Sequence, residues 1–183
     1  MVYNYNTTIS PVDDILFTKS GYNNTYGELT DKGLDTILKG IDTKNKNFID
    51  LGSGCGSVVI NACKNYPFHG CGGVELSKER HLIAYDRKKE LSETLNPDVI
   101  LKFVNKDIFD VDVNQGDVFY ISNLCFNEEI NKKLSKKLNR EVQKGSVIIS
   151  SREIPDLNYS RHEKINGVKQ SWSNSSDVHR YLI

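Results

Sequence analysis

The amino-acid sequence predicts an α/β fold of the Rossmann-like type, in which helices cover both faces of a mostly parallel sheet. Two observations lead to this prediction. An apolar strand at residues 48–51 runs into a glycine-rich turn at 52–56, and a second apolar run then begins a helix. Beyond this unit, short apolar runs alternate with helical patterns along the chain, which is typical of repeated strand–helix units in a parallel sheet.

The glycine-rich turn predicts a ligand site at the end of the first strand. Gly52, Gly54 and Gly56 let the backbone turn sharply and approach a ligand closely. The turn lacks the Lys and Ser/Thr of a phosphate-binding P-loop, and Ser57 stands where a dinucleotide site has its third glycine. Asp50, followed by these glycines, resembles the S-adenosylmethionine (AdoMet) site of Rossmann-like methyltransferases, because an acid suits a cofactor with an ammonium group. A nicotinamide or flavin site and a turn without a ligand are the alternatives.

Composition narrows the class of protein. The chain of 183 residues is the size of one domain. Lys plus Arg equal Asp plus Glu at 24 each, so no net charge draws it to nucleic acid or an anionic membrane. Its four cysteines form neither a CxxC pair nor a dense disulfide framework, which indicates reduced thiols in an intracellular protein, cytoplasmic or nuclear. No apolar run approaches the ~20 residues of a membrane span.

Polar residues follow three further strands at the predicted carboxyl edge of the sheet. Glu75 ends a strand about 20 residues beyond the glycine turn, where an acid accepts hydrogen bonds from ribose hydroxyls. Asp107 follows the third strand, where an acid receives the adenine amino group. Asn123 follows the fourth strand and opens onto the crevice in which ligands bind, so we expect the reaction there.

The remaining patterns complete the predicted fold. Helices are expected over residues 31–41, 57–65, 77–95 and 130–142, and strands over 70–76, 99–105, 117–122 and 146–150. Residues 152–183 alternate weakly, which predicts a loop and one or two antiparallel edge strands. Residues 1–30 are rich in Tyr, Asn, Thr and Gly without apolar periodicity, so we expect an arm or lid over the cofactor site, ahead of a catalytic core at 31–183.

The basic residues between Lys132 and Lys144 lie largely off the apolar stripe of their helix, which Ile130, Leu134, Leu138 and Val142 form. This face is either solvated or a weak docking surface for nucleic acid. The histidines and cysteines show no metal-ligand spacing, so no metal is expected. A Gly-x-Ser-x-Gly nucleophile elbow is also missing, which leaves a hydrolase triad without support.

Several separated stretches together resemble one family, the non-SET-domain histone lysine methyltransferases named for disruption of telomeric silencing. The stretches are residues 22–28 (YNNTYGE), the glycine turn at 50–56, the fourth strand and its turn at 118–126 (VFYISNLCF), and the closing segments at 171–173 and 181–182. The resemblance spans most of the chain and implies a class I AdoMet-dependent methyltransferase with a seven-stranded sheet. It further implies that AdoMet is the cofactor and a protein lysine, possibly on a histone, the substrate.

The resemblance also implies roles for single residues. Tyr26 closes over the methionine end of AdoMet, and Glu28 holds its ammonium group together with Asp50. Asn123 orients the amine or the cofactor, and Ile108 lies at the adenine, where the family has an aromatic residue. Phe126 and Trp172 form walls of the lysine channel.

The sequence departs from the family pattern at several positions. Ser122 replaces a first asparagine, Leu29 a threonine and Ser57 a glutamine, and Arg180 aligns with a tyrosine that lines the lysine channel. The family's preceding helical segment and its basic tail are not in the sequence, so nucleosome recognition is not implied. A nucleic-acid base N-methyltransferase is one alternative, although Leu124 and Cys125 stand where that class has two prolines. A non-catalytic AdoMet-binding protein is the other.

Overall fold

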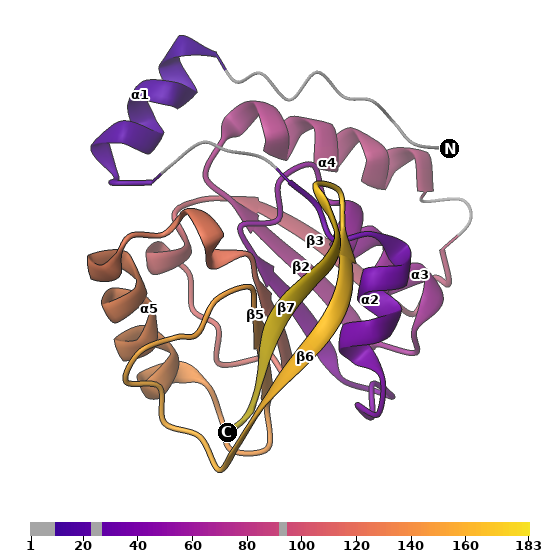
Figure 1. Cartoon of the computed structure of the whole chain (residues 1–183). Helices are drawn as coiled ribbons and strands as arrows, with labels where there is room; N and C mark the ends of the chain where they lie inside the picture. Colours follow the sequence, from indigo (N-terminus) through magenta and orange to yellow (C-terminus); the bar gives the residue numbers. More distant parts are fainter. Residues whose placement is uncertain (1–9, 23–26, 92–94) are drawn as a thin grey trace.

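The structure is a computed structural model that describes residues 10–22, 27–91 and 95–183. One seven-stranded sheet organises it, with the strand order β3-β2-β1-β4-β5-β7-β6 (Figure 1). Strands β1 to β5 pair in parallel, and β7 runs antiparallel to both of its neighbours. The strands are β1 (Asn47–Leu51), β2 (Gly70–Glu75), β3 (Ile100–Asn105), β4 (Val118–Ile121), β5 (Val147–Ser150), β6 (Arg161–Gln170) and β7 (Ser173–Leu182). The predicted α/β class, with its seven-stranded and mostly parallel sheet, is confirmed.

Helices cover both faces of this sheet and create two cores (Figure 1). The helices are α1 (Pro11–Lys19), α2 (Asp31–Leu38), α3 (Ser57–Asn65), α4 (Lys78–Leu91) and α5 (Glu128–Glu141), and short 3-10 turns span Ile108–Asp110 and Asn123–Cys125. One core packs apolar residues of α2, α3 and α4 against the sheet. The other packs α5 against the opposite face through Leu134 and Leu138, as the apolar stripe of this helix predicts. Because the strands β1 to β5 are parallel, their carboxyl ends lie together at one end of the sheet, between the helices of its two faces.

The C-terminal hairpin provides the antiparallel strands expected for residues 152–183. Of its two strands, β6 lies at one edge of the sheet, and β7 inserts between β5 and β6. Tyr181 of β7 is fully buried, and its hydroxyl accepts a hydrogen bond from the backbone N–H of Ile154 (3.1 Å). A strand with two paired edges and a buried tyrosine belongs to the core of the domain.

Helix α1 occupies part of the stretch for which no regular element was predicted. Its apolar residues Val12 and Ile15 are exposed while Phe17 is buried, so the helix has no apolar stripe that periodicity would detect. Polar contacts hold it as well. Ser10 caps its first turn, and the buried Asp13 accepts a hydrogen bond from the Ser77 hydroxyl at the start of α4 (2.5 Å). The Ser-Pro capping pattern was the available sequence signal for this helix.

The buried stripe of α5 yields a stability prediction. Leu134 is fully buried, so Leu134→Ala should lower the free energy of unfolding by about 2–5 kcal/mol, through lost burial and the cavity left behind. Urea unfolding measures this change. Leu82→Ala is the matched control, since Leu82 also lies in a helix but is 48% exposed and should change stability by less than about 0.5 kcal/mol. Equal losses in the two variants would contradict the assignment of α5 to the core.

Candidate cofactor and substrate site

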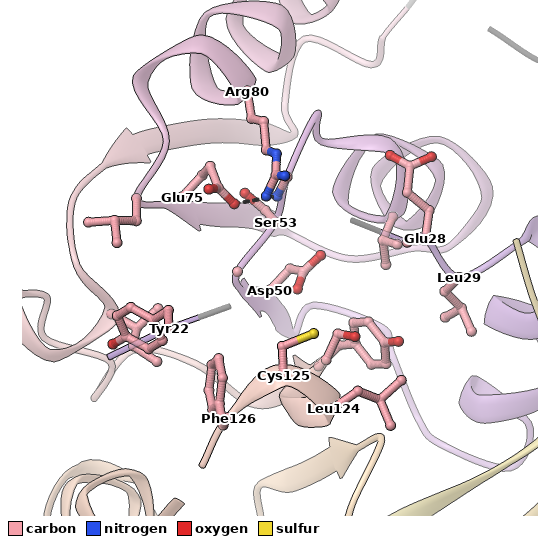
Figure 2. A pocket seen from close by; sticks show the side chains of 18 of the residues that line it. Tyr22, Glu28, Leu29, Asp50, Ser53, Glu75, Arg80, Leu124, Cys125 and Phe126 are labelled. Carbon is pink, nitrogen blue, oxygen red and sulfur yellow. Dashed lines mark hydrogen bonds between the residues drawn. The ribbon is translucent and has the colours of Figure 1, made fainter. Parts of the chain in front are cut away.

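A cavity of about 260 Å³ lies at the carboxyl ends of β1, β2 and β4 (Figure 2). This volume is near the lower end of the ~300–1,000 Å³ typical of small-molecule sites. Four carboxylates line it, those of Glu28, Asp50, Glu75 and Asp107. Apolar and aromatic side chains complete its wall, namely Tyr22, Leu29, Ile108, Tyr120, Leu124, Phe126 and Trp172. The cavity therefore combines these acids and the Arg80 side chain with an apolar rim.

The glycine turn forms one wall of this cavity. All three of its glycines have positive φ, at +99° for Gly52, +53° for Gly54 and +82° for Gly56, a region that side chains disfavour. A Cβ on Gly56 would lie 2.7 Å from the Phe103 ring, whereas among the described residues nothing lies within 4 Å of a Cβ on Gly52. Gly56 thus allows close packing under the turn, and Gly52 exposes bare backbone to the cavity.

Glu75 ends β2 beside this turn and is buried. Its two carboxylate oxygens accept hydrogen bonds from the backbone N–H groups of Gly54 and Ser77, both at 2.8 Å. Burial raises the pKa of Glu75, while the Ser77 N–H, the Arg80 guanidinium and the Gly54 N–H oppose that rise. Each oxygen keeps a further lone pair for a ligand hydroxyl. The role of Glu75 at a ribose stays a prediction.

Asp50 ends β1 in the middle of the cavity, between Glu75 and Glu28 (Figure 2). It is 2% exposed, and its Oδ1 has no hydrogen-bond partner within the described part of the chain. Burial raises the pKa of Asp50 well above its ordinary value, and the negative charges of Glu75 and Glu28 raise it further. An unpaired buried carboxyl between two other carboxylates is a site for a cation.

Asp107 lies on the other side of the cavity, where it caps a 3-10 turn. Its Oδ1 accepts hydrogen bonds from the Phe109 backbone N–H (2.9 Å) and from the Tyr22 hydroxyl (3.0 Å). The Tyr22 ring also packs on Phe126, with 5.4 Å between ring centroids. Tyr22 therefore links Asp107 to Phe126 across the cavity, a role that its position in the sequence did not indicate. Ile108 is buried and lines the cavity next to Asp107, as expected.

The segment that begins at Gly27 is held against the β6–β7 turn by hydrogen bonds. Glu28 N–H donates to the Ser171 hydroxyl (3.0 Å), and Ser171 N–H donates to the Glu28 carbonyl (2.8 Å). One residue later Leu29 bridges to Gln170. Trp172, in the same turn, lines the cavity. These contacts bring residues that are about 140 positions apart in sequence to one rim, including Glu28 and Trp172, which were both predicted site residues.

Glu28 also closes the end of the cavity above the glycine turn. Its Oε1 accepts a hydrogen bond from the Ser57 hydroxyl (2.6 Å). The same hydroxyl oxygen accepts one from the Arg87 guanidinium (2.7 Å), and Arg87 donates a second to the Cys55 carbonyl (2.9 Å). Ser57 thus anchors Glu28, and it is not among the described residues that line the cavity.

Asn123 has a different place from the one expected for it. It is fully buried and is not among the described residues that line the cavity. Its amide group donates to the Asn131 side chain (2.8 Å) and the Arg152 carbonyl (3.2 Å), and its Oδ1 accepts from the Arg152 N–H (2.7 Å). The neighbouring Ser122 lines the cavity instead. Tyr26, the other residue expected to be catalytic, lies outside the described residues.

Arg180 is also displaced from its expected position at the lysine channel. Its guanidinium donates to Glu163 (2.5 Å) and to the backbone carbonyls of Ile37 and Lys39 at the end of α2 (3.3 and 2.9 Å). Arg180 therefore caps a helix C-terminus, where a cation is favourable, and it is not among the described residues of the cavity wall.

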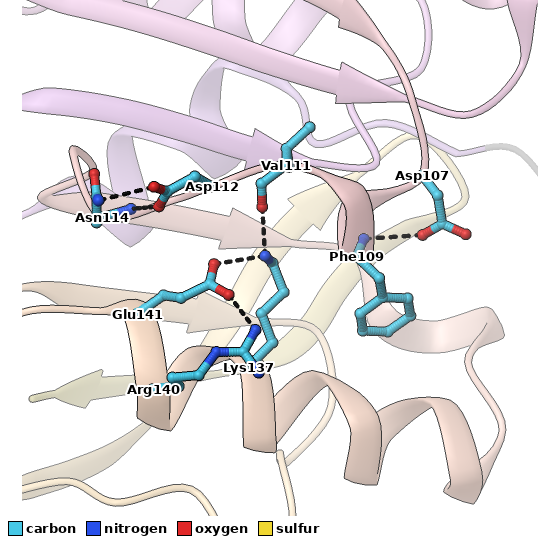
Figure 3. Close-up of polar contacts among 8 residues, drawn as sticks. All are labelled: Asp107, Phe109, Val111, Asp112, Asn114, Lys137, Arg140 and Glu141. Carbon is cyan, nitrogen blue, oxygen red and sulfur yellow. Dashed lines mark hydrogen bonds and ion pairs between the residues drawn. The ribbon is translucent and has the colours of Figure 1, made fainter.

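Three of the six basic residues between Lys132 and Lys144 form ion pairs with acids of α5. Lys132 pairs with Glu128 (2.6 Å), and Lys137 and Arg140 pair with Glu141 (both 2.5 Å) (Figure 3). Lys137 was expected off the apolar stripe but is buried, because its ammonium group also donates to the Val111 carbonyl. This pairing weakens the case for nucleic-acid docking between Lys132 and Lys144.

The described part of the chain holds neither a cluster of metal ligands nor a membrane-spanning helix. No three His, Cys, Asp or Glu side chains gather there as a metal site requires. None of its helices is long and apolar enough to cross a membrane.

Comparison with known proteins now identifies the chain. The model of the histone methylation protein DOT1 family matches residues 5–181. The chain belongs to the DOT1 family. A DOT1-type relative from Eremothecium gossypii, a histone-lysine N-methyltransferase specific for H3 lysine 79, is 30% identical over 156 residues, which cover 78% of this chain and 26% of the relative. A second relative, from Emericella nidulans and of the same name, is 28% identical over 206 residues. The match covers 93% of this chain and 38% of the relative. The DOT1-type chain thus spans about a quarter to two fifths of these relatives.

Solved structures agree with the DOT1-type fold. An RNA methyltransferase from Salinibacter ruber, in complex with S-adenosyl-L-homocysteine, superposes with a TM-score of 0.62 at 21% identity, covering 82% of this chain and 89% of that one. A structure titled as a putative AdoMet-dependent methyltransferase from Methanococcus maripaludis superposes with a TM-score of 0.53 at 17% identity. The superposition covers 76% of this chain and 59% of that one. At such identities the likeness concerns the fold, which is that of class I methyltransferases.

The contact between Gly27 and Trp172 yields a spectroscopic prediction. A Cβ on Gly27 would lie 2.1 Å from ring carbons of Trp172, the single tryptophan of the sequence. Gly27→Ala should displace the ring, increase acrylamide quenching of its fluorescence and weaken ligand binding several-fold. Gly72→Ala is the control, because its Cβ would meet nothing closer than 3.9 Å in the described structure. Unchanged quenching in Gly27→Ala would contradict the close packing of this rim.

The raised pKa of Asp50 predicts how stability depends on pH. Between the ordinary value of 3.8 and the raised native value, the native state holds a proton that the unfolded state releases, so the stability of the protein falls as the pH rises. Asp50→Asn removes this ionisation. The variant should therefore melt higher than the parent at neutral pH, and the difference should shrink toward pH 4.

Thermal melts across this pH range measure the effect. Asp98→Asn serves as the control, since Asp98 is exposed and its replacement should leave the pH dependence unchanged. An advantage of Asp50→Asn that stayed constant with pH would show that the carboxyl of Asp50 is not the titrating group.

Proposed function

We propose that this chain is an AdoMet-dependent methyltransferase whose acceptor is a lysine side chain of a protein, with a histone as the favoured substrate. The observation that carries the proposal is the unpaired, buried Asp50 carboxyl on the floor of the cavity. AdoMet has a cationic amino acid end and an adenosine end, and the cavity offers acids for both. The lysine acceptor is favoured by membership of the DOT1 family and by the names of the two relatives.

The residues present fit the cofactor. Asp50, with Glu28 beside it, would receive the ammonium group, and the bare backbone at Gly52 would let the methionine part approach. Glu75 would accept the ribose hydroxyls, and Asp107 and Ile108 would lie at the adenine. Gly54 and Gly56 would support this arrangement from beneath. AdoMet, when bound, supplies a methyl group on a positively charged sulfur that a neutral amine can attack directly.

The apolar rim would receive the substrate. Phe126 and Trp172, with Leu124, give the cavity an opening that excludes water from an aliphatic lysine stem. A lysine ammonium must lose its proton before it can accept a methyl group, and an apolar environment lowers its pKa. The rim would thus favour the reactive form of the amine and align it with the methyl group.

Asn123 and Tyr26 complete the proposed machinery. Asn123 would act as a positioning residue, because its amide ties the turn after β4 to Arg152 after β5. Tyr26 would close over the methionine end, next to Glu28. A histone substrate would place the protein in the nucleus. We favour the 31–183 unit as the catalytic core and the preceding residues as its lid.

Methyl transfer from labelled AdoMet tests the proposal. Separate pools of histone octamers, nucleosomes, other proteins, DNA and RNA should be incubated with the protein, and label is expected on lysine in the histone or nucleosome pool. Label in nucleic acid would show a base methyltransferase, and label in none of the pools, despite AdoMet binding, would show a non-catalytic protein.

Isothermal titration tests the cofactor half separately. Asp50→Asn should weaken AdoMet binding by about 30-fold or more, the equivalent of 2 kcal/mol or more for losing one partner of a buried charge pair. Asp98→Asn should bind as the parent does. Full-strength AdoMet binding by Asp50→Asn would remove the basis of the cofactor assignment.

A further inference from the structure

The hydroxyl of Tyr120 is a polar atom in the cavity that the proposed cofactor contacts do not use. Tyr120 lies on β4, directly beside Asp50 of β1 in the parallel register, and lines the cavity. The residue is 2% exposed, and its hydroxyl makes no hydrogen bond of good geometry in the described part of the chain, although the Ser151 and Ser122 hydroxyls lie close enough to influence its pKa. A buried hydroxyl without a partner is costly, so its presence indicates a ligand that completes it.

The surroundings of this hydroxyl indicate which ligand that is. Ser122 lines the cavity two residues further along the chain, and Ser151 follows the neighbouring strand β5. The Ser151 hydroxyl is likewise buried and makes no hydrogen bond of good geometry among the described residues, although it lies near the Tyr120 hydroxyl. The acids proposed to hold the cofactor come instead from the ends of β1 to β3 and from Glu28. The hydroxyls thus occupy the β4–β5 side, where Phe126 and Leu124 form the apolar opening.

We propose that the Tyr120 hydroxyl contacts the acceptor amine and holds it by a hydrogen bond. The inference rests on the proposed methyltransferase function and adds a catalytic residue to it. A neutral amine has N–H donors and one lone pair, so a hydroxyl oxygen that accepts an N–H directs the lone pair toward the methyl group. An amine in an apolar opening has few other partners.

The electrostatic surroundings decide how Tyr120 acts. Burial raises the pKa of Tyr120, and the negative charge of Asp50 raises it further, while the Ser151 and Ser122 hydroxyls oppose the rise. The phenol is therefore neutral at ordinary pH. It orients an amine that has already lost its proton, and it does not remove that proton itself.

Tyr120→Phe tests the proposal, because it deletes one oxygen and keeps the buried ring. Two probes should be titrated calorimetrically. One is S-adenosylhomocysteine, and the other is an analogue in which nitrogen replaces the sulfur and carries a short aminoalkyl chain in place of the methyl group. Tyr120→Phe should bind the amine-bearing analogue about tenfold more weakly, as for one hydrogen bond to a polar group. It should bind S-adenosylhomocysteine within twofold of the parent, and its melting temperature without ligand should be equal or higher.

Tyr66→Phe is the matched control. The Tyr66 hydroxyl bonds to Asp35 (2.5 Å) outside the cavity, so its loss should change the affinity for neither probe. A rise in melting temperature together with selective loss of the amine probe separates a ligand contact from a structural bond.

Other outcomes overturn the inference in distinct ways. Equal weakening of both probes would assign the hydroxyl to the cofactor, and unchanged binding of both would show no contact. A clear fall in melting temperature would show that the hydroxyl has a structural partner. If the parent protein does not bind S-adenosylhomocysteine, the proposed function fails and this inference fails with it.

Discussion

The carboxyl of Asp50 is the interaction around which the site is built. It stands at the end of β1, which lies between β2 and β4 in the sheet, and it has carboxylates on either side. Like charges in a buried setting oppose ionisation, so the free protein carries an electrostatic penalty at this point. A cationic ligand removes that penalty, which ties the affinity of the site to a positive charge on its ligand.

The two acids beside Asp50, Glu75 and Glu28, are held by hydrogen bonds to distant parts of the chain. Ser77 links Glu75 to the N-terminal helix α1, since its N–H donates to Glu75 and its hydroxyl to Asp13. On the opposite side, the β6–β7 turn holds Glu28 over the glycine turn through Ser171. The cavity is therefore closed by segments from both ends of the chain, and each is tied down by hydrogen bonds rather than by a large apolar face.

Two neighbouring residues after β4 show where reasoning from sequence reaches its limit. Position in the motif selected Asn123, but the chain passes into a 3-10 turn there, and the alternation of a strand no longer tells which side chain faces the cavity. Ser122 faces it, and Asn123 holds the adjoining loop. The direction in which Arg180 points depends on the register of a hairpin, which carries irregularities between Ile165 and Val168 and again before Gln170. Lys137 is buried because its ammonium group bonds to Glu141 of the same helix and to the Val111 carbonyl of another segment.

The sequence by itself determined the α/β class, most element positions and the acids that end the strands, because glycine conformations, helix caps and apolar periods are local properties. It also determined family membership through motifs that keep their order along the chain. The tertiary structure alone decided which side chains share the cavity. Strand order places β4 beside β1 and β7 beside β5, and the contacts of the N-terminal segment with the β6–β7 turn close the rim. The unpaired state of Asp50 and Tyr120 is also a property of packing, since a partner for a buried group comes from whatever distant segment lies against it.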